Sequence, residues 1–357
     1  MKKIILLIAA TLAFAKFAPN SKCQECHPLI YQEFTQSMHA KATIFKDPIH
    51  AAVWKKHPLH KKGAYKCAKC HTPAANNFKE LIAPNGIGPD PKNVSQNDAV
   101  ACAYCHRIEA VKEGNRTNSN VISSHPRIYF GARKEHIASP FHKIDTSKAT
   151  FLKGTSCMGC HSHNRNNKGL FLCKMEYNAT SECASCHMPQ VPGSVSTLKK
   201  RATHAFHGFA GAHIAPKMLA KYVDLSLAPT PNGLRLTITS HIPHELLSHP
   251  ARVAFVKVMV LRDGKTVWQK RELLVRIIGK NGKPTPPWLA TQVLKDTMLK
   301  ANESRSYSYD VTLQKGDKVV ALLGYRLVKP PLAKKLGLDP KLNKPVILKK
   351  VTFIFEG

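Results

Sequence analysis

The sequence predicts an α+β fold in which a mainly helical and irregular part comes first and an antiparallel β-sandwich follows. Three observations predict this. A five-residue pattern recurs between residues 23 and 187 of the 357-residue chain, and Pro- and Gly-rich irregular stretches separate its copies. From residue 222 onward the pattern is absent, and alternating apolar and polar residues with hairpin turns replace it. We therefore expect one domain at 16–215 and a second at 220–357, after a leader at 1–15.

The repeated pattern is C-x-x-C-H, which is typical of covalent haem c attachment. Two thiols three positions apart lie on one face of a helical turn and can bond one haem, while the adjacent His binds its iron. Zinc knuckles and redox dithiols also use C-x-x-C pairs, but neither requires a His after the second Cys in all five copies. The sequence therefore predicts five covalently attached haem c groups. The expected attachment residues are Cys23, Cys26, Cys67, Cys70, Cys102, Cys105, Cys157, Cys160, Cys183 and Cys186, and the expected proximal ligands are His27, His71, His106, His161 and His187.

The first fifteen residues have the composition of an export signal. Met1-Lys2-Lys3 is positively charged, Ile4 to Ala15 is apolar, and Ala13-Phe14-Ala15 supplies the small residues of a cleavage site. A mature start near Lys16 is expected, with an uncleaved membrane anchor as the alternative. Because haem c is attached outside the bacterial cytoplasm, we expect a periplasmic protein.

The chain is strongly basic, with a formal net charge of +32. Removal of the leader lysines and addition of roughly ten haem propionates would leave about +20. Such a field favours an acidic redox protein partner, a membrane quinol-linked donor or an anionic membrane surface; a solvated basic surface without a partner is the alternative. The leader and the haem motifs argue against a nucleic-acid partner.

Histidines outside the motifs are candidates for the second axial ligand of each iron, because the 19 histidines far outnumber the motifs. A second strong ligand would leave no position for a substrate. Met38 could ligate in place of His39, and His50 competes with two neighbours before the second motif. The probable distal ligands are His39, His142, His204 and His244, and the possible ones are His57, His60, His125, His136, His207 and His213.

One cysteine, Cys173, belongs to no motif. Two roles are compatible with the sequence: a buried or partly buried thiol without function, and a reactive or iron-ligating thiolate.

The second half has seven expected strands and one short expected helix, and it carries no haem motif of its own. The strands are expected at 222–227, 234–240, 252–261, 266–278, 304–312, 318–328 and 346–355, and the helix at 332–336.

Nearly the whole mature chain resembles bacterial multihaem c-type cytochromes of the cytochrome c-552/4 type, which are related to the tetrahaem carriers that accept electrons from hydroxylamine oxidoreductase. The resemblance implies mostly bis-His haems stacked in close pairs, with distal roles for His39, His142, His204 and His244. The matching features are Cys23 to His27 followed by Ser37-Met38-His39, Cys102 to His106 followed by Arg-Ile, Phe130-Gly131 leading to His142, Cys183 to Pro189, His204 to Gly208, His244 with Arg252, and Trp288 with Asp296-Thr297.

Two departures from the resemblance are visible. The loop at 240–252 has Pro243-His244 in place of a Gly-His pair, and the C-x-x-C-K motif common at the catalytic haem of pentahaem nitrite reductases does not occur.

Three functions follow from the sequence. The leading hypothesis is a periplasmic carrier that transfers electrons between respiratory partners through mostly bis-His haems. The alternative is an oxidoreductase acting on a small nitrogen or sulfur compound at one haem with an open site. A docking module in a respiratory complex is the third.

Overall fold

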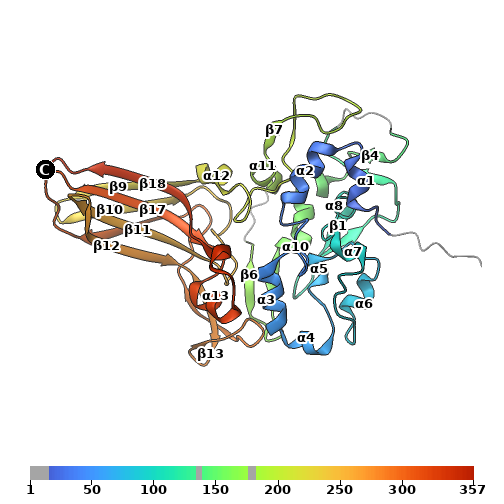
Figure 1. The fold of residues 1–357 in the computed structure, drawn as a ribbon, viewed down its shortest axis with the longest axis horizontal. Coiled ribbons are helices and arrows are strands. Elements are labelled where there is room, and N and C mark those ends of the chain that lie inside the picture. The colour runs from blue at the N-terminus through green and yellow to red at the C-terminus, as the bar shows by residue number, and fades with distance from the viewer. Residues whose placement is uncertain (1–15, 134–138, 176–181) are drawn as a thin grey trace, which may run out of the picture.

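A computed structural model describes residues 16–133, 139–175 and 182–357. The expected signal peptide and His136 lie outside these ranges. Two parts lie side by side along the long axis, a helical part and a flat β-rich part, with β6 and α13 near their junction (Figure 1). In the described ranges no helix combines the length and apolar character needed to cross a membrane.

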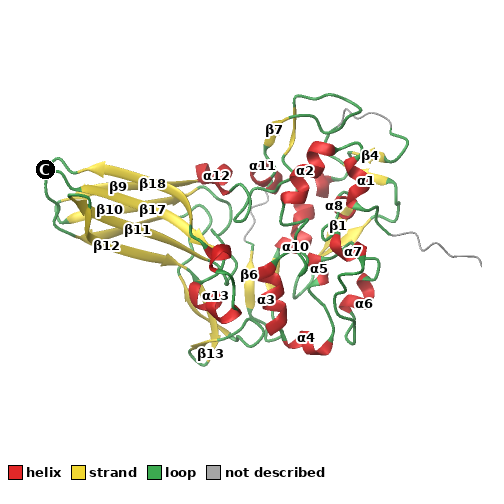
Figure 2. Cartoon of the chain, viewed as in Figure 1, coloured by secondary structure: helices red, strands yellow, loops and turns green. Residues whose placement is uncertain are grey.

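The first part is built from short helices joined by long loops (Figure 2). Several begin at proline, which suits the first helical position, and Asp47 caps α3 by accepting a hydrogen bond from the Ile49 amide at 2.9 Å. Helices this short are marginal alone and depend on packing. They are α1 (Asn20–Gln24), α2 (Pro28–Gln36), α3 (Pro48–Lys56), α4 (Pro58–Lys62), α5 (Ala68–His71), α6 (Phe78–Ile82), α7 (Val94–Asn97), α8 (Cys102–Cys105), α9 (Ala149–Leu152), α10 (Met158–His161), α11 (Cys183–His187) and α12 (Pro216–Leu219).

Four two-stranded sheets tie the loops of this part together. The β3–β4 pair is parallel and the other three pairs are antiparallel. The strands are β1 (Ile108–Lys112), β2 (Ser119–Ile122), β3 (Ile128–Phe130), β4 (Lys143–Asp145), β5 (His163–Arg165), β6 (Phe171–Lys174), β7 (Gln190–Pro192) and β8 (Thr203–Ala205).

The second part contains two large antiparallel sheets, ordered β16-β10-β9 and β12-β11-β17-β18, and a small sheet ordered β14-β13-β15. The helix α13 (Pro330–Leu336) follows β17. The α+β class with an antiparallel second half is therefore confirmed. The strands are β9 (Val223–Thr230), β10 (Gly233–Ser240), β11 (Val253–Arg262), β12 (Lys265–Leu274), β13 (Arg276–Lys280), β14 (Lys283–Pro284), β15 (Gln292–Asp296), β16 (Ser304–Asp310), β17 (Lys318–Arg326) and β18 (Val346–Ile354).

The strand expected at 266–278 is two strands, β12 and β13, separated at Val275. The Thr297 hydroxyl accepts from the Val275 amide at 3.0 Å and donates to the Leu273 carbonyl at 2.7 Å. A side chain thus takes the place of a neighbouring strand, so β13 can leave the large sheet. It pairs with β14 and β15, neither of which was expected.

The two parts differ in how much hydrophobic core they have. Seventeen buried apolar residues form one cluster between the large sheets, with Leu234, Val258 and Leu323 fully buried. The described residues of the helical part, although more numerous, form clusters of only six and five residues. The described residues of the helical part therefore have a small apolar core for their number, which leaves room for a large apolar group in the interior.

Candidate haem centres

The motifs occupy short helical turns. Four of the five lie on α5, α8, α10 and α11, and the first follows α1, so each pair of thiols shares a face with the histidine one position later. A four-ligand zinc site needs at least three His, Cys, Asp or Glu side chains together. Among the described residues no such group is found.

Hydrogen bonds orient most of the motif histidines. In four of them Nδ1 faces a backbone carbonyl, and because a carbonyl only accepts, Nδ1 carries the proton and Nε2 keeps its lone pair. This arrangement prepares an imidazole for a metal at Nε2. The pairs are His27 with the Val195 carbonyl at 2.6 Å, His71 with Ala42 at 3.0 Å, His106 with Phe130 at 2.8 Å and His187 with Ala210 at 2.6 Å.

Four motif histidines have a second imidazole at the spacing that an iron requires. An iron bonded to two imidazole nitrogens, each about 2 Å away, holds the ring centroids roughly 6 Å apart. The opposed rings are His27 and His142 at 6.3 Å, His161 and His39 at 6.0 Å, His106 and His207 at 6.3 Å, and His187 and His244 at 6.1 Å. Rings at this distance do not pack directly against each other. The gap between them therefore fits an intervening group.

Two of the four opposed histidines are also oriented by a backbone carbonyl at Nδ1. Nδ1 of His207 faces the Ala205 carbonyl at 2.6 Å, and Nδ1 of His244 faces the Glu245 carbonyl at 2.9 Å. The Nδ1 atom of His142 is buried without a hydrogen-bond partner. Burial lowers the pKa of His39 to about 3 and of His207 to about 4, which keeps these imidazoles neutral.

His71 differs from the other motif histidines. The ring that packs against it is His50, with centroids 4.0 Å apart, which is too close for an intervening iron. The Nδ1 atoms of both rings face the same Ala42 carbonyl, at 2.9 Å for His50 and 3.0 Å for His71. His50 therefore lies beside His71 rather than across an iron from it. Among the described residues no imidazole stands opposite His71 at about 6 Å.

Both ring nitrogens of His204 are occupied by protein atoms. Nδ1 faces the Gly193 carbonyl at 3.0 Å, and Nε2 contacts the Glu33 carboxylate at 2.9 Å. The same carboxylate accepts from the His207 amide at 2.8 Å. The structure thus turns His207, and not His204, toward a motif histidine. Nothing in the sequence marks Glu33, which lies on α2 among other polar residues.

Among the described residues, the remaining candidate histidines, which are His57, His60, His125 and His213, do not face a motif histidine at iron spacing. His57 accepts a hydrogen bond at Nδ1 from the Leu59 amide at 3.1 Å, so its proton is on Nε2. His60 and His125 are exposed. Burial lowers the pKa of His213 to about 4, and the nearby Arg252 charge adds to the effect.

Contacts between motifs connect the five attachment sites. The thiols of Cys23 and Cys102 lie close enough to shift each other's pKa, as do those of Cys70 with Cys160 and of Cys157 with Cys183. Asn120 bridges the third and fourth motifs, because its amide donates to the Tyr104 hydroxyl at 3.2 Å and lies 3.8 Å from the Cys160 sulfur. Groups attached there are neighbours in one series, with the fourth site in contact with the second, third and fifth.

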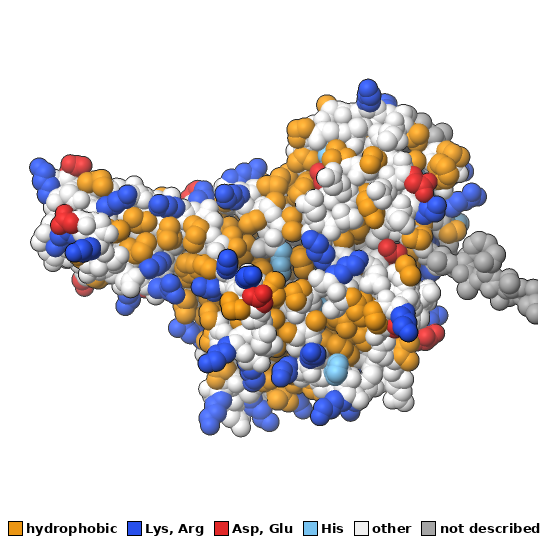
Figure 3. Space-filling model, viewed as in Figure 1, with side chains coloured by type: hydrophobic (Ala, Val, Ile, Leu, Met, Phe, Trp, Pro, Cys, Tyr) orange, Lys and Arg blue, Asp and Glu red, His pale blue; other side chains and the backbone are white. Residues whose placement is uncertain are grey.

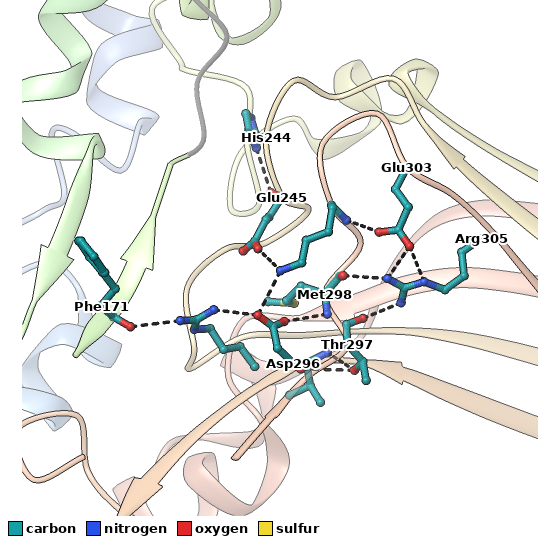
Figure 4. Close-up of polar contacts among 11 residues, drawn as sticks. Phe171, His244, Glu245, Asp296, Thr297, Met298, Glu303 and Arg305 are labelled. Atoms are coloured by element: carbon teal, nitrogen blue, oxygen red, sulfur yellow. Dashed lines mark hydrogen bonds and ion pairs between the residues drawn. The ribbon is translucent and has the colours of Figure 1, made fainter. Parts of the chain in front are cut away.

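A polar network fixes the sandwich loop that carries His244 (Figure 4). Glu245, which is buried, binds Lys300, whose ammonium also contacts Asp296 at 3.1 Å. Asp296 accepts from Arg276 at 2.7 Å, and Arg276 reaches the Phe171 carbonyl of β6 at 3.3 Å. The network therefore joins the His244 loop and the small sheet to a strand of the helical part.

Cys173 lies on β6 opposite Asn164. Burial raises the pKa of its thiol, and the Asn164 backbone and the Arg276 charge act against this rise. The half-buried thiol is therefore protonated, and neither of its two expected roles is decided.

The residues present fit haem c. The thiol pairs share faces with oriented imidazoles, four second imidazoles stand across a gap of the right size, and the interior of this part is deficient in apolar side chains.

Comparison with known proteins agrees with this arrangement. Residues 22–107 match the model of a family described as cytochrome c554 and c-prime. The fold is similar to the crystal structure of a penta-heme cytochrome c552 from Thermochromatium tepidum, with a TM-score of 0.78, 22% sequence identity, and coverage of 96% of this chain and 100% of that chain. No curated protein matches the sequence.

Proposed function

We propose that the chain is a multihaem c-type cytochrome with covalently bound haem c, and that it is a periplasmic pentahaem carrier that transfers electrons between respiratory partners. Bound haem c supplies one-electron chemistry between ferric and ferrous iron. The observation that carries the proposal is the set of four opposed imidazole pairs at 6.0–6.3 Å, because two strong ligands leave no position for a substrate.

The assignment of ligands follows from the same spacing. We assign His142 opposite His27, His39 opposite His161, His207 opposite His106, and His244 opposite His187. His204 is excluded from this set because both of its nitrogens are bonded to protein. Contacts between motif thiols support one continuous series of attached groups, which is what a conducting protein requires.

The surface supports an acidic partner. Lysine and arginine side chains are spread over both parts of the visible face, and acidic side chains are few (Figure 3). Such a surface attracts an acidic redox protein, the acidic face of a membrane quinol-linked donor, or anionic lipid headgroups. The positively charged and apolar residues 1–15 support export.

The test is a count of haems and of their spin states. Mass spectrometry of the exported holoprotein should show five covalently added haems, and the ferric protein should give at least four low-spin signals by electron paramagnetic resonance. His207→Ala should convert one low-spin signal to high-spin, whereas His204→Ala should leave the number of low-spin haems unchanged. The opposite pattern in these two variants would refute the ligand assignment.

A second function is favoured by the environment of His71, which has no opposed imidazole among the described residues. We propose as the alternative that the haem attached at Cys67 and Cys70 has an open position and that the protein acts there on a small nitrogen or sulfur compound. A high-spin ferric signal and carbon monoxide binding to the reduced protein, both with a stoichiometry of one, are expected. A protein with five low-spin haems and no carbon monoxide binding would leave only the carrier.

A further inference from the structure

We infer that Arg107 is a buried cation that raises the reduction potential of the third haem, meaning the haem attached at Cys102 and Cys105. The inference rests on the proposed function, because it requires haem c at the third motif. It adds to the proposed carrier a residue that sets the driving force for electron transfer at one of its haems.

Burial distinguishes Arg107 from the other basic residues. The chain has 54 Lys and Arg. Among the described residues, Arg107 is the one Lys or Arg that is buried, with 3% of its surface exposed. It directly follows His106, the expected proximal ligand of the third haem. Because consecutive Cα atoms are about 3.8 Å apart, the guanidinium belongs to the same region of the interior as that ligand.

Backbone carbonyls and one aromatic ring hold the guanidinium in place. Nη1 of Arg107 donates to the Lys16 carbonyl at 2.7 Å, and Nη2 donates to the Ser123 carbonyl at 2.5 Å. The guanidinium carbon lies 5.2 Å from the centroid of the Phe17 ring. These groups enclose the charge and satisfy two of its donor nitrogens, but none of them carries a negative charge.

Apolar side chains fill the space between this charge and the third motif. The Phe17 ring packs edge-on against the Tyr104 ring with centroids 5.5 Å apart, and Tyr104 lies between the two motif cysteines. Both rings belong to a buried cluster that also contains Ala101, Ala103 and Ile108. A charge in such surroundings is only weakly screened by water and salt.

No protein carboxylate compensates the Arg107 charge. Among the described residues Arg107 forms no ion pair, and Glu109, two positions later, contacts Lys148 at 2.7 Å instead. The Nε atom of Arg107 is buried without a hydrogen-bond partner. The protein therefore places a net positive charge inside its core, next to the third motif.

Such a charge favours the ferrous state of a nearby iron, because reduction lowers the positive charge on the iron by one. A unit charge about 12 Å from a redox centre, at an effective dielectric constant of about 20, changes the equilibrium constant for one-electron reduction about tenfold. Glu33, which binds the amide of the proposed distal ligand His207, has the opposite sign. Arg107 and Glu33 thus act on the potential of the third haem in opposite directions.

The experiment is potentiometry of the holoprotein, followed by electron paramagnetic resonance of the low-spin haem that His207→Ala converts. Arg107→Met and Arg107→Gln should each lower the equilibrium constant for its reduction about tenfold, which is about 59 mV for one electron. Arg107→Lys keeps the charge and should stay within about twofold of the wild type. Lys112→Gln removes an exposed charge on β1, which solvent screens, and should also stay within about twofold.

The order of the variants separates charge from structure. A purely structural role would follow hydrogen-bonding capacity, so Arg107→Met would differ from Arg107→Gln, and Arg107→Gln would resemble Arg107→Lys. Equal potentials in the wild type and both neutral variants would show that a haem propionate accepts from Nε and cancels the charge, which would overturn the inference. If the neutral variants do not retain five haems, Arg107→Lys decides the question: a wild-type potential supports the inference, and a fall of about tenfold in the equilibrium constant overturns it.

The identification of the haem keeps this inference distinct from the proposed function. If His207→Ala converts one low-spin signal and the potential of that haem does not respond to the charge at position 107, only this inference fails. If His207→Ala converts no signal, the ligand assignment fails. The inference is then overturned as well unless the potential of one haem falls in both neutral variants.

Discussion

At the scale of the residue, the buried contact between Glu33 and His204 positions a neighbouring histidine, His207. Nδ1 of His204 faces the Gly193 carbonyl and Nε2 contacts the Glu33 carboxylate, and the His204 side chain is fully buried. A buried ion pair contributes little net stability because desolvation offsets attraction. The second oxygen of Glu33 holds the His207 amide, so we regard Glu33 as a positioning residue for His207.

Glu33→Gln should disturb one haem. A glutamine oxygen can satisfy only one of the two donors, and its amide group faces the other donor. Loss of negative charge near an iron disfavours the ferric state, so the midpoint potential of that haem should rise, on the order of 50 mV. Potentiometry with electron paramagnetic resonance of the haem affected by His207→Ala measures the shift.

Asp224→Asn is the matched control for this change. It removes an exposed carboxylate–histidine contact, to His241 at 2.8 Å, on the sandwich. A purely structural role for Glu33 would lower the melting temperature and leave every potential unchanged. Glu33→Asp should recover part of the wild-type potential because it restores the charge.

The residues also show what the sequence could and could not predict. The expected attachment residues could be named from the sequence alone, because the pattern that predicts them lies within five consecutive residues. The opposed imidazoles were harder to predict, because each comes from a segment that is distant in the sequence. His142 faces His27, and His207 faces His106. The sequence favoured His204 over His207 and His213 as a distal ligand, and it could not show that both ring nitrogens of His204 contact the protein while His207 faces His106.

At the scale of the element, prediction from the sequence also failed where a contact joins residues that are distant in the chain. The large strands were predictable from alternation, because each buries one face. The break at Val275 was not, since the apolar pattern continues through it and a hydroxyl from Thr297, far along the chain, causes it. The small sheet β14-β13-β15 depends on that break.

The loop between β10 and β11 places His244 of the sandwich opposite His187. The Glu245–Lys300–Asp296–Arg276 network stabilises this loop (Figure 4). Lys300→Met should leave the carboxylates of Glu245 and Asp296 without their shared cation. Because Lys300 is partly exposed, we expect a loss of about 1–2 kcal/mol in the free energy of unfolding. The low-spin signal of the haem at His187 should broaden, because His244 is held less firmly.

Denaturant unfolding and electron paramagnetic resonance measure these two effects. Lys148→Met, which breaks a single contact to Glu109 at 2.7 Å, is the control and should give the smaller loss of stability. Equal losses in the two variants, with an unchanged signal at His187, would show that the network does not support the loop.

At the scale of the whole molecule, the two parts have unequal interiors and share one function. The sandwich has its own apolar core of seventeen buried residues. The described residues of the helical part form two small apolar clusters, which fits our proposal that attached haems complete this part. The sandwich therefore contributes His244, which stands opposite the motif histidine His187 of the helical part.

The charge of the whole molecule leads to a prediction about rate. The chain has 54 Lys and Arg against 22 Asp and Glu, and basic side chains cover both parts (Figure 3). Such a field should speed encounter with anionic reagents and slow encounter with cationic ones. At 0.1 M salt, exposed charges more than about 10 Å apart are largely screened from each other. Raising the salt concentration should therefore remove both effects.

Stopped-flow kinetics with small reagents of opposite charge tests this without an identified partner. The rate of oxidation of the reduced protein by anionic ferricyanide should fall as salt rises from 0.01 to 0.5 M, on the order of tenfold. The rate with cationic hexaammineruthenium(III) should rise over the same range. Because both reagents experience the same haems and the same change in protein hydration, opposite slopes can come only from the sign of the charge. Reversed slopes, with the ferricyanide rate rising and the hexaammineruthenium(III) rate falling as salt rises, would mean that negative charge around the exposed haem edges, and not the molecular field, governs encounter. An acidic partner would then have no general advantage.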